Sequence, residues 1–107
     1  MMAIPSLLTL DMDAELERQI GIIPGHCRSG LLSYLRYGRR PGHFLLAVLS
    51  NNLAAACGAA DNENRIALND YVSLLYDCAP RAAWGSPDNV EQWIARGAEL
   101  RKAEAGS

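Results

Sequence analysis

The sequence lacks long hydrophobic runs, paired cysteines and a basic N-terminal segment, and each absence excludes a class of protein. No apolar run approaches the roughly 18 residues of a membrane-spanning helix, and "MMAIPSLLTLDMD" has no basic region typical of a signal peptide. The three cysteines, Cys27, Cys57 and Cys78, cannot all pair and form no C-x-x-C motif. Each lies in an apolar periodic segment, which predicts that the cysteines are reduced core residues in a cytoplasmic protein. The missing apolar run and the missing signal peptide predict that the protein makes no contact with a membrane.

Alternating runs of β-branched residues are also absent, so the sequence predicts no β-strands. Half of the 107 residues are hydrophobic and 21% are charged, which are the values of an ordinary folded domain. The length predicts one helical domain, residues 1–107, in which 1–10 and 104–107 are expected to be flexible ends.

Hydrophobic periodicity and helix-end signals predict helices joined by short loops. Asp11 is expected to cap the first helix, Asp61 the fourth and Ser86 the fifth, whereas Pro24 opens the second helix and Gly38 ends it. Short loops favour antiparallel neighbours, so the predicted fold is all-α, a compact bundle of about five helices. The helices are expected near residues 11–20, 24–37, 41–57, 61–79 and 87–103.

The third predicted helix, residues 41–57, is apolar on nearly every side and is therefore expected to be the central, buried one. The polar triplet Ser50-Asn51-Asn52 interrupts it. We expect these side chains to bond neighbouring backbone inside the bundle, because reading adenine bases with asparagine would require an exposed helix. The residues expected in the core include Leu46, Val48, Leu49, Leu53, Leu75 and Trp93.

Few groupings of residues offer catalytic or metal-binding chemistry. His26 and His43 are the only histidines, whereas a structural zinc site needs four ligands with closely spaced pairs. Cys27 follows His26 directly, but neighbouring side chains in a helix point about 100° apart, so the two are poorly placed to act as a nucleophile and its base. Ser86 lies in no G-x-S-x-G motif. The sequence therefore predicts a non-enzymatic protein with no catalytic residue, metal or cofactor.

Negative charge is missing from one long segment of the chain. Residues 18–60 contain five arginines (18, 28, 36, 39 and 40) and no Asp or Glu, although the net charge of the protein is −2. The remainder has five basic residues against twelve acidic ones, a balance of −7. This asymmetry makes the protein dipolar and predicts a partner that presents charge of one sign to it.

The segment "YLRYGRRPGH", residues 34–43, is the first candidate docking site. Its arginines lie near a helix C-terminus, where the helix dipole favours cations, and the next helix begins beside them with outward N–H groups that suit an anion. The second candidate is the turn "WGSP", with Trp84 and Ser86. The first candidate site comprises Arg28, Arg36, Tyr37, Arg39, Arg40 and His43.

A protein with an acidic surface is the expected partner, and nucleic acid bound by the same arginines is the alternative. A helix-turn-helix formed by the second and third helices would have to present polar residues to the DNA groove, which "FLLAVLSNNLAAAC" does not do. The acidic pI of about 5.6 also differs from that of most duplex-binding domains.

The order "PGHFLLAVLSNNL", "AADNENRIAL", "YVSLLYDCAP" and "WGSPDNVEQWI" resembles a family of small uncharacterised all-α proteins of proteobacterial phages and mobile elements. The likeness, with the pattern PG-x-FL-x-AVLSN followed by WGSP-x-x-V-x-x-W, covers about residues 22–95. It implies an accessory protein in the cytoplasm of the bacterial host that binds a host protein. An inhibitor of a bacterial defence system, of the anti-CRISPR kind, is the role that the resemblance suggests.

Overall fold

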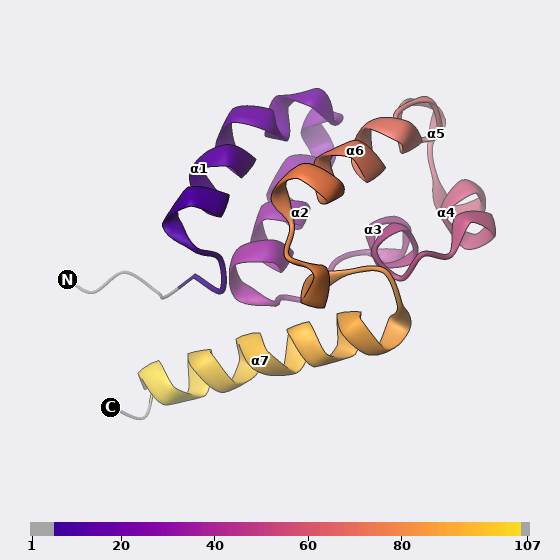
Figure 1. Cartoon of the computed structure of the whole chain (residues 1–107). Helices are drawn as coiled ribbons and strands as arrows, with labels where there is room; N and C mark the ends of the chain where they lie inside the picture. Colours follow the sequence, from indigo (N-terminus) through magenta and orange to yellow (C-terminus); the bar gives the residue numbers. More distant parts are fainter. Residues whose placement is uncertain (1–5, 106–107) are drawn as a thin grey trace.

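The structure, a computed structural model, describes residues 6–105. These residues form seven α-helices and two short 3₁₀ turns (Figure 1). These residues contain no β-strand, and the predicted all-α bundle is confirmed. None of their helices is long and apolar enough to cross a membrane. The helices are α1 (Leu10–Gln19), α2 (Gly25–Tyr37), α3 (His43–Leu49), α4 (Leu53–Ala59), α5 (Asn62–Ile66), α6 (Leu68–Cys78) and α7 (Pro87–Ala105), with 3₁₀ turns η1 (Ile20–Ile22) and η2 (Arg81–Ala83).

Most helix ends lie where the local signals predict them. Gly38 ends α2 with the left-handed φ of 67° that glycine adopts without strain. The carboxylate of Asp61 caps α5 by accepting from the N–H of Asn64, and the hydroxyl of Ser86 caps α7 by accepting from the N–H of Asn89. The prediction of Asp11 as the first cap is wrong. Thr9 caps α1 instead, because the helix begins one residue before Asp11.

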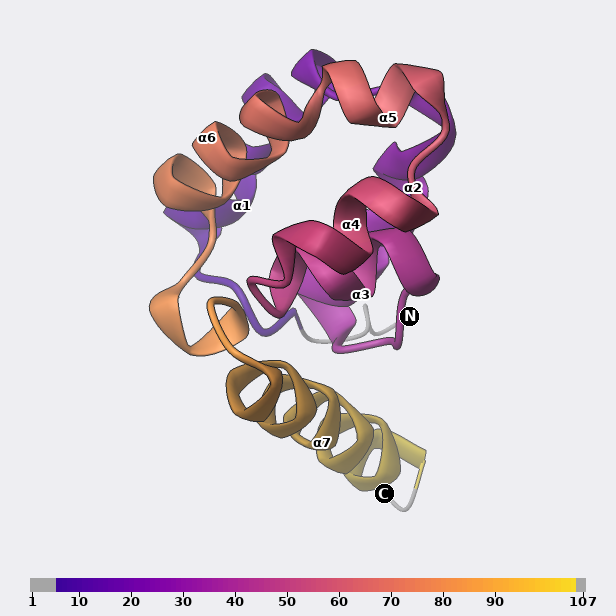
Figure 2. The ribbon, with the colours of Figure 1, turned by 90° about the vertical axis from the view of Figure 1, so that its right-hand side faces the viewer.

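The predicted central helix over residues 41–57 is wrong, since two helices, α3 and α4, occupy this segment. Asn51 has a φ of 63°, which ends α3, and the side chain of Asn52 accepts from the N–H of Ala55 and starts α4. Asparagine tolerates the left-handed conformation and caps helices well, so the pair forms a turn. Both side chains are exposed rather than inside the bundle, and α3 and α4 lie side by side (Figure 2).

The predicted helix over residues 61–79 is also divided. Ala67 has a φ of −87° and a ψ of 3°, which separates α5 from α6. The apolar spacing of this segment predicts one buried flank formed by Ile66, Tyr71, Val72, Leu75 and Cys78. Ile66 is instead exposed, because the inner faces of α5 and α6 are not continuous across the break. Tyr71, Leu75 and Cys78 of α6 are buried as predicted.

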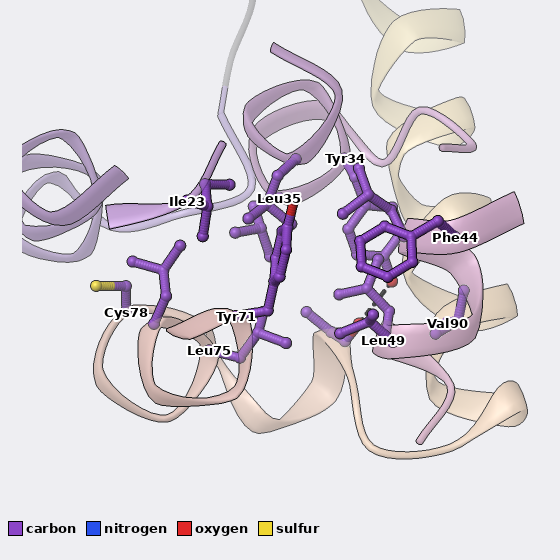
Figure 3. Close-up of a cluster of buried hydrophobic side chains, with 14 of the residues drawn as sticks. Ile23, Tyr34, Leu35, Phe44, Leu49, Tyr71, Leu75, Cys78 and Val90 are labelled. Carbon is purple, nitrogen blue, oxygen red and sulfur yellow. Dashed lines mark hydrogen bonds between the residues drawn. The ribbon is translucent and has the colours of Figure 1, made fainter. Parts of the chain in front are cut away.

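The core lies between α1, α2, α3, α6 and α7, and Figure 3 shows part of it. Of the six core residues predicted above, Val48, Leu49, Leu75 and Trp93 are confirmed, and Leu46 is half-buried. Leu53 is 69% exposed, because the turn at Asn51 places the start of α4 on the surface. The largest fully buried side chains are Leu16, Ile23, Leu31, Tyr34, Leu35, Leu49, Tyr71, Leu74, Leu75, Cys78 and Val90.

The three cysteines differ in burial. Cys78 is a core residue as predicted, and burial raises the pKa of its thiol. Cys27 and Cys57 are only half-buried, so the prediction that all three belong to the core is wrong for these two. All three are free thiols in the structure.

The ends of the described chain are attached to the bundle. Leu8 is buried, the N–H of Leu7 donates to the carbonyl of Arg36 at 2.6 Å, and α7 continues to Ala105. Of the end segments 1–10 and 104–107, residues 1–5 and 106–107 lie outside the described residues.

Two glycines let α7 approach the C-terminal end of α2 backbone to backbone. A Cβ atom added to Gly97 would overlap the carbonyl oxygen of Tyr37 and lie 2.7 Å from the Cα of Gly38. A Cβ on Gly38 would in turn lie 2.6 Å from the carbonyl oxygen of Trp93. Figure 1 shows the result, with α7 in yellow running below α2 and α3.

Side chains of α7 also satisfy carbonyl groups at the end of α2. The indole N–H of Trp93 donates to the carbonyl of Tyr34 at 3.0 Å, and the guanidinium of Arg101 donates to that of Tyr37. The last carbonyls of a helix have no partner within the helix, so these bonds complete it. The hydroxyl of Tyr34 donates to the carbonyl of Ala83 at 2.6 Å and so fixes η2 to the same site.

Two leucines test the break between α3 and α4. Leu49→Ala should lower the free energy of unfolding by about 2–5 kcal/mol, because Leu49 is 0% exposed and its removal leaves a cavity. Leu53→Ala should change it by only about 0.5 kcal/mol. Urea denaturation of both variants measures the difference, and equal losses would mean that residues 41–57 form one buried helix after all.

The contact between α7 and α2 is tested by Gly97→Ala. The added methyl group meets backbone atoms that cannot rotate away, so the free energy of unfolding should fall by about 1–3 kcal/mol or more. Gly58→Ala is the matched control, since nothing lies within 4 Å of a Cβ there and alanine favours a helix by about 1 kcal/mol or less. A Gly97→Ala variant as stable as Gly58→Ala in urea would contradict the close contact.

Candidate functional site

The arginine at the centre of the first predicted site is already neutralised within the protein. The guanidinium of Arg36 donates to the carboxylate of Asp13 at 2.6 and 2.9 Å and to that of Glu17 at 2.7 Å. The hydrogen bond to Asp13 is the main reason why the pKa of Arg36 is raised. The acid-free sequence around Arg36 predicts that its charge has no compensation nearby. This prediction is wrong, because α1 brings two acids against α2.

Two further arginines of this site also have internal partners. Arg40 forms an ion pair with Glu91 of α7 at 2.6 Å, with both side chains largely exposed. Arg28 donates to the carbonyls of Ile23 and Gly21, each at 3.0 Å, and so completes the turn η1. The guanidinium groups of Arg28 and Arg36 are therefore both engaged within the protein.

The remaining members of the first site lie at the junction between α2 and α3. The guanidinium of Arg39 lies over the ring of Tyr37, 5.1 Å from its centroid, and Arg39 forms no ion pair with the described residues. His43, the first residue of α3, is exposed. The structure thus leaves Arg39 as the arginine of this site that is exposed without a carboxylate partner.

The second predicted site lies where η2 meets α6 and α7. Ser86 is engaged as the cap of α7. Trp84 is half-buried and contacts Tyr76 of α6 edge to face, with ring centroids 5.0 Å apart and an interplanar angle of 84°. Tyr76 is 72% exposed, which is a large aromatic surface to leave in contact with water.

A hollow of about 390 Å³, which we name the Trp84 hollow, opens beside these rings. Gly85 has a φ of 102°, and its N–H donates to the carbonyl of Leu49 at 2.7 Å, which holds the turn against α3. The amide of Asn89 donates to the carbonyls of Trp84 and Arg81 at 2.9 and 3.3 Å. The hollow is lined by Asn51, Tyr76, Ala79, Arg81, Trp84, Gly85 and Asn89.

A second hollow of about 290 Å³, the Leu53 hollow, lies between α4 and α6. Its lining carries no charged side chain. Asn51 lines both hollows, so they adjoin at this residue, and we name the two together the Asn51 surface. The Leu53 hollow is lined by Val48, Asn51, Asn52, Leu53, Ala56, Leu68, Asn69 and Val72.

Some residues of the Asn51 surface, among them Leu53 and Val72, were predicted to be core or inner flank, whereas Trp84 belongs to the second predicted site. The prediction placed Leu53 and Val72 inside because it treated α3 and α4 as one helix and assigned a broad apolar flank to α6. Two signals point to the surface. Asn-Asn is typical of turns, and on α6 the buried positions 71, 74, 75 and 78 leave 72, 73 and 76 on the opposite face.

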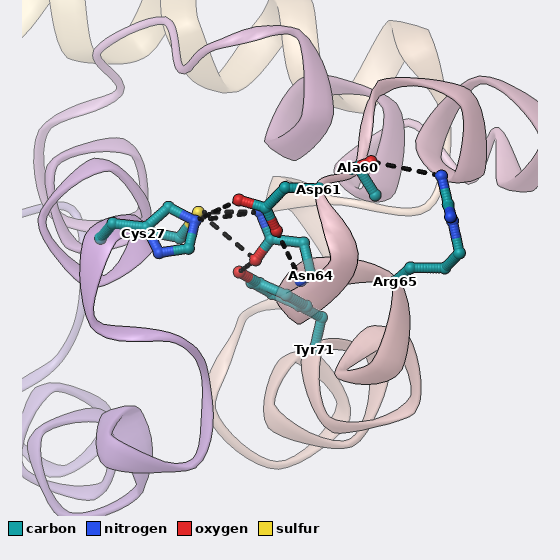
Figure 4. Close-up of polar contacts among 7 residues, drawn as sticks. Cys27, Ala60, Asp61, Asn64, Arg65 and Tyr71 are labelled. Carbon is teal, nitrogen blue, oxygen red and sulfur yellow. Dashed lines mark hydrogen bonds and ion pairs between the residues drawn. The ribbon is translucent and has the colours of Figure 1, made fainter.

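A separate polar cluster joins the start of α2 to α5 (Figure 4). Asn64, which is buried, accepts a hydrogen bond from the hydroxyl of Tyr71 at 2.6 Å, and its amide nitrogen lies 3.3 Å from the sulfur of Cys27. The same nitrogen lies 3.4 Å from Nε2 of His26. Burial raises the pKa of Tyr71. Asn64 thus satisfies three neighbours at once and fixes two helices to each other.

His26 also forms an ion pair with Asp61, with 2.9 Å between Nε2 and Oδ2. The pKa of Asp61 is lowered, chiefly because its carboxylate accepts from the backbone N–H of Asn64 and also because His26 lies beside it. The fold therefore brings together His26 and Cys27 with residues far along the chain. Within residues 6–105, no group of three or more His, Cys, Asp or Glu side chains is placed to hold a metal ion.

Comparisons of the chain with protein-family models, curated proteins and solved structures gave no match. The contacts and hollows described above are therefore the basis for the function proposed below.

Acid titration tests the cap of α5. Because the pKa of Asp61 is lower in the folded protein than its ordinary value of 3.8, the unfolded state binds this proton first as the pH falls. The stabilisation that ionised Asp61 gives the folded protein is present at pH values above the ordinary pKa. It is lost as the pH falls through the lower pKa of Asp61 in the folded protein. Asp61→Asn keeps a capping oxygen without the charge, so the advantage of the wild type in urea should shrink between about pH 6 and about pH 3.

Glu99→Gln, at an exposed position of α7, is the control for removal of one carboxylate. The variation of the wild-type minus Asp61→Asn difference with pH is compared with that of the wild-type minus Glu99→Gln difference. If the Asp61→Asn difference varies no more with pH than the Glu99→Gln difference, Asp61 is not stabilised in its charged form.

Proposed function

We propose that this protein is a non-enzymatic accessory protein that binds a second protein through the Asn51 surface. The observation that carries the proposal is the aromatic pair formed by the exposed Tyr76 and the half-buried Trp84, beside two adjoining hollows. Tyrosine, tryptophan and arginine are enriched among the residues that dominate the energy of protein interfaces, particularly where they fill or border pockets. Arg81 lines the same hollow and supplies the third of these residue types.

Apolar groups gather on this surface from two helices. Leu53 of α4 and Val72 of α6 are exposed and line the Leu53 hollow, and Tyr76 lies one turn beyond Val72 on α6. An apolar patch rimmed by polar groups is typical of interaction sites, and here the rim is formed by Asn51, Asn52 and Asn69 of the hollow itself. Burial of these side chains by a partner would add a hydrophobic contribution that the folded monomer does not use.

The arginines favour a protein partner over nucleic acid. Phosphates bound at Arg36 or Arg40 would have to replace carboxylates that already lie 2.6 Å away. The Leu53 hollow has no charged group to offer a phosphate backbone. We therefore favour a protein with acidic groups over nucleic acid as the partner.

The resemblance to proteins of phages and mobile elements suggests where the partner belongs. On this proposal it is a host protein in the bacterial cytoplasm, and the role is inhibition of a defence system of the anti-CRISPR kind. On this proposal the protein covers a functional surface of its target, which requires complementary groups and no catalytic residues.

Site-specific photo-crosslinking in bacterial cells tests the proposal. Benzoylphenylalanine at position 76 should form a discrete adduct with one host protein, and Val72→Glu in the same chain should remove the adduct, because a carboxylate would have to be buried in an uncharged hollow. Gels and mass spectrometry of the adduct provide the readout.

Position 10 is the control for this experiment, since Leu10 is 90% exposed, lies on α1 and lines neither hollow. The same crosslinker at position 10 should give no comparable adduct. Equal adducts from both positions, or an adduct at position 76 that survives Val72→Glu, would contradict binding through the Asn51 surface.

A further inference from the structure

We infer that the Asn51 surface recognises a peptide segment of its partner in which a carboxylate lies close to an apolar side chain. This inference rests on the proposed function and adds the chemistry of the partner to it. The carboxylate would bind Arg81 in the Trp84 hollow, and the apolar side chain would enter the Leu53 hollow. Two independent features of the surface lead to this assignment, the state of Arg81 and the absence of charge in the second hollow.

Arg81 differs from the other arginines of the protein in having no internal use for its guanidinium. The chain has nine arginines, all within residues 6–105. Three form ion pairs with carboxylates, three donate to backbone carbonyls, and two lie over aromatic rings. The guanidinium of Arg81 has no such partner among the described residues, although it lines a hollow next to two aromatic rings.

A carboxylate is the group that suits this position. A guanidinium has five N–H donors in a planar fork and binds a carboxylate through two parallel hydrogen bonds. A peptide bound against the rings of Tyr76 and Trp84 would exclude water from part of the hollow, which would strengthen a charge-assisted bond there. None of the other residues that line the Trp84 hollow is charged, so a bound carboxylate would meet a cation and no competing acid.

The Leu53 hollow selects for the opposite property. Five of its lining side chains are apolar and three are asparagines, so a charged group that entered would lose its hydration without gaining an ion pair. An aliphatic or aromatic side chain gains from the same transfer. The exposed Leu53 and Val72 are the groups that it would cover.

Asn51 sets how close the two groups must be in the partner. Because it lines both hollows, the carboxylate and the apolar side chain must come from neighbouring positions of one segment. Its exposed side-chain amide has a donor and an acceptor, which suits the backbone of a peptide passing between the hollows. A lone small anion would use Arg81 alone and leave the Leu53 hollow unfilled, so we favour a peptide.

Selection from a displayed library of random dodecapeptides tests the inference on the purified full-length protein. The wild type should enrich peptides that have Asp or Glu at a fixed short spacing from an aliphatic or aromatic residue. Arg81→Glu should lose the preference for the acid and enrich Lys or Arg in its place, because the charge of the hollow is reversed. Val72→Glu should lose the apolar preference.

Arg39→Glu is the matched control, since Arg39 is an exposed arginine without a carboxylate partner on another part of the molecule. It should enrich the same peptides as the wild type. For one enriched peptide, fluorescence anisotropy should show affinity reduced about tenfold or more by Arg81→Ala, the loss expected when a charged partner is removed, and nearly unchanged by Arg39→Ala. Circular dichroism confirms that each variant is folded.

Three results would overturn the inference: no enriched peptides, enriched peptides without an acid, or binding that depends on Arg39 instead of Arg81. Crosslinking at position 76 does not depend on the peptide sequence, so it separates the two proposals. An adduct at position 76 together with any of these three results would leave the proposed function standing and remove only the carboxylate-and-apolar motif. Failure of both experiments would remove both.

Discussion

The backbone contact between Gly38 and Gly97 determines where the last third of the molecule lies. It brings α7 close enough for Trp93 and Arg101 to reach the end of α2, where the carbonyls of Tyr34 and Tyr37 need donors. A side chain at either glycine would hold the helices apart and leave these donors without acceptors. The start of α7 and the turn before it are then fixed as well, because Tyr34 also donates to the carbonyl of Ala83. Arg81 and Trp84 flank that carbonyl in the chain, so a structural contact on one side of the bundle sets the position of the proposed binding groups.

The second half of the candidate surface depends on the turn at Asn51. A continuous helix over 41–57 would bury Leu53 and leave no space between α4 and α6. With the turn, α4 folds back beside α3, and its first residues face Val72 across the Leu53 hollow. The turn at Gly85 is bonded to the last residue of α3 by the N–H that donates to Leu49. Two residues with a left-handed φ, Asn51 and Gly85, therefore both line the Trp84 hollow, and both mark places where a helical pattern in the sequence is broken.

The features that the sequence predicts well are those set by neighbours along the chain. The ends of α2 and α7 follow from Gly38 and Ser86, because a cap acts within one turn. The break in the apolar segment 41–57 was not predicted, since an apolar residue fits a buried helix and the flank of a hollow equally well. Contacts between distant residues were missed for a different reason. The pair Arg36–Asp13 spans 23 residues and the pair Arg40–Glu91 spans 51, and no local pattern encodes such distances.

The acid-free segment shows why the location of charge in a sequence and its location on a surface are different quantities. Every described ion pair joins a base in residues 18–60 to an acid outside that range: Arg18 to Glu15, His26 to Asp61, Arg36 to Asp13 and Glu17, and Arg40 to Glu91. The partner of opposite sign that the asymmetry predicts is thus largely the rest of the same chain. Exposed pairs of this kind contribute little to stability, but like charges in contact would be costly, so they help to specify which helix faces meet. Arg81 lies outside the acid-free segment, where composition gives it no prominence. Its importance in our proposal comes from the fold, which gives the other arginines a carboxylate, a carbonyl or a ring and leaves this one beside a hollow.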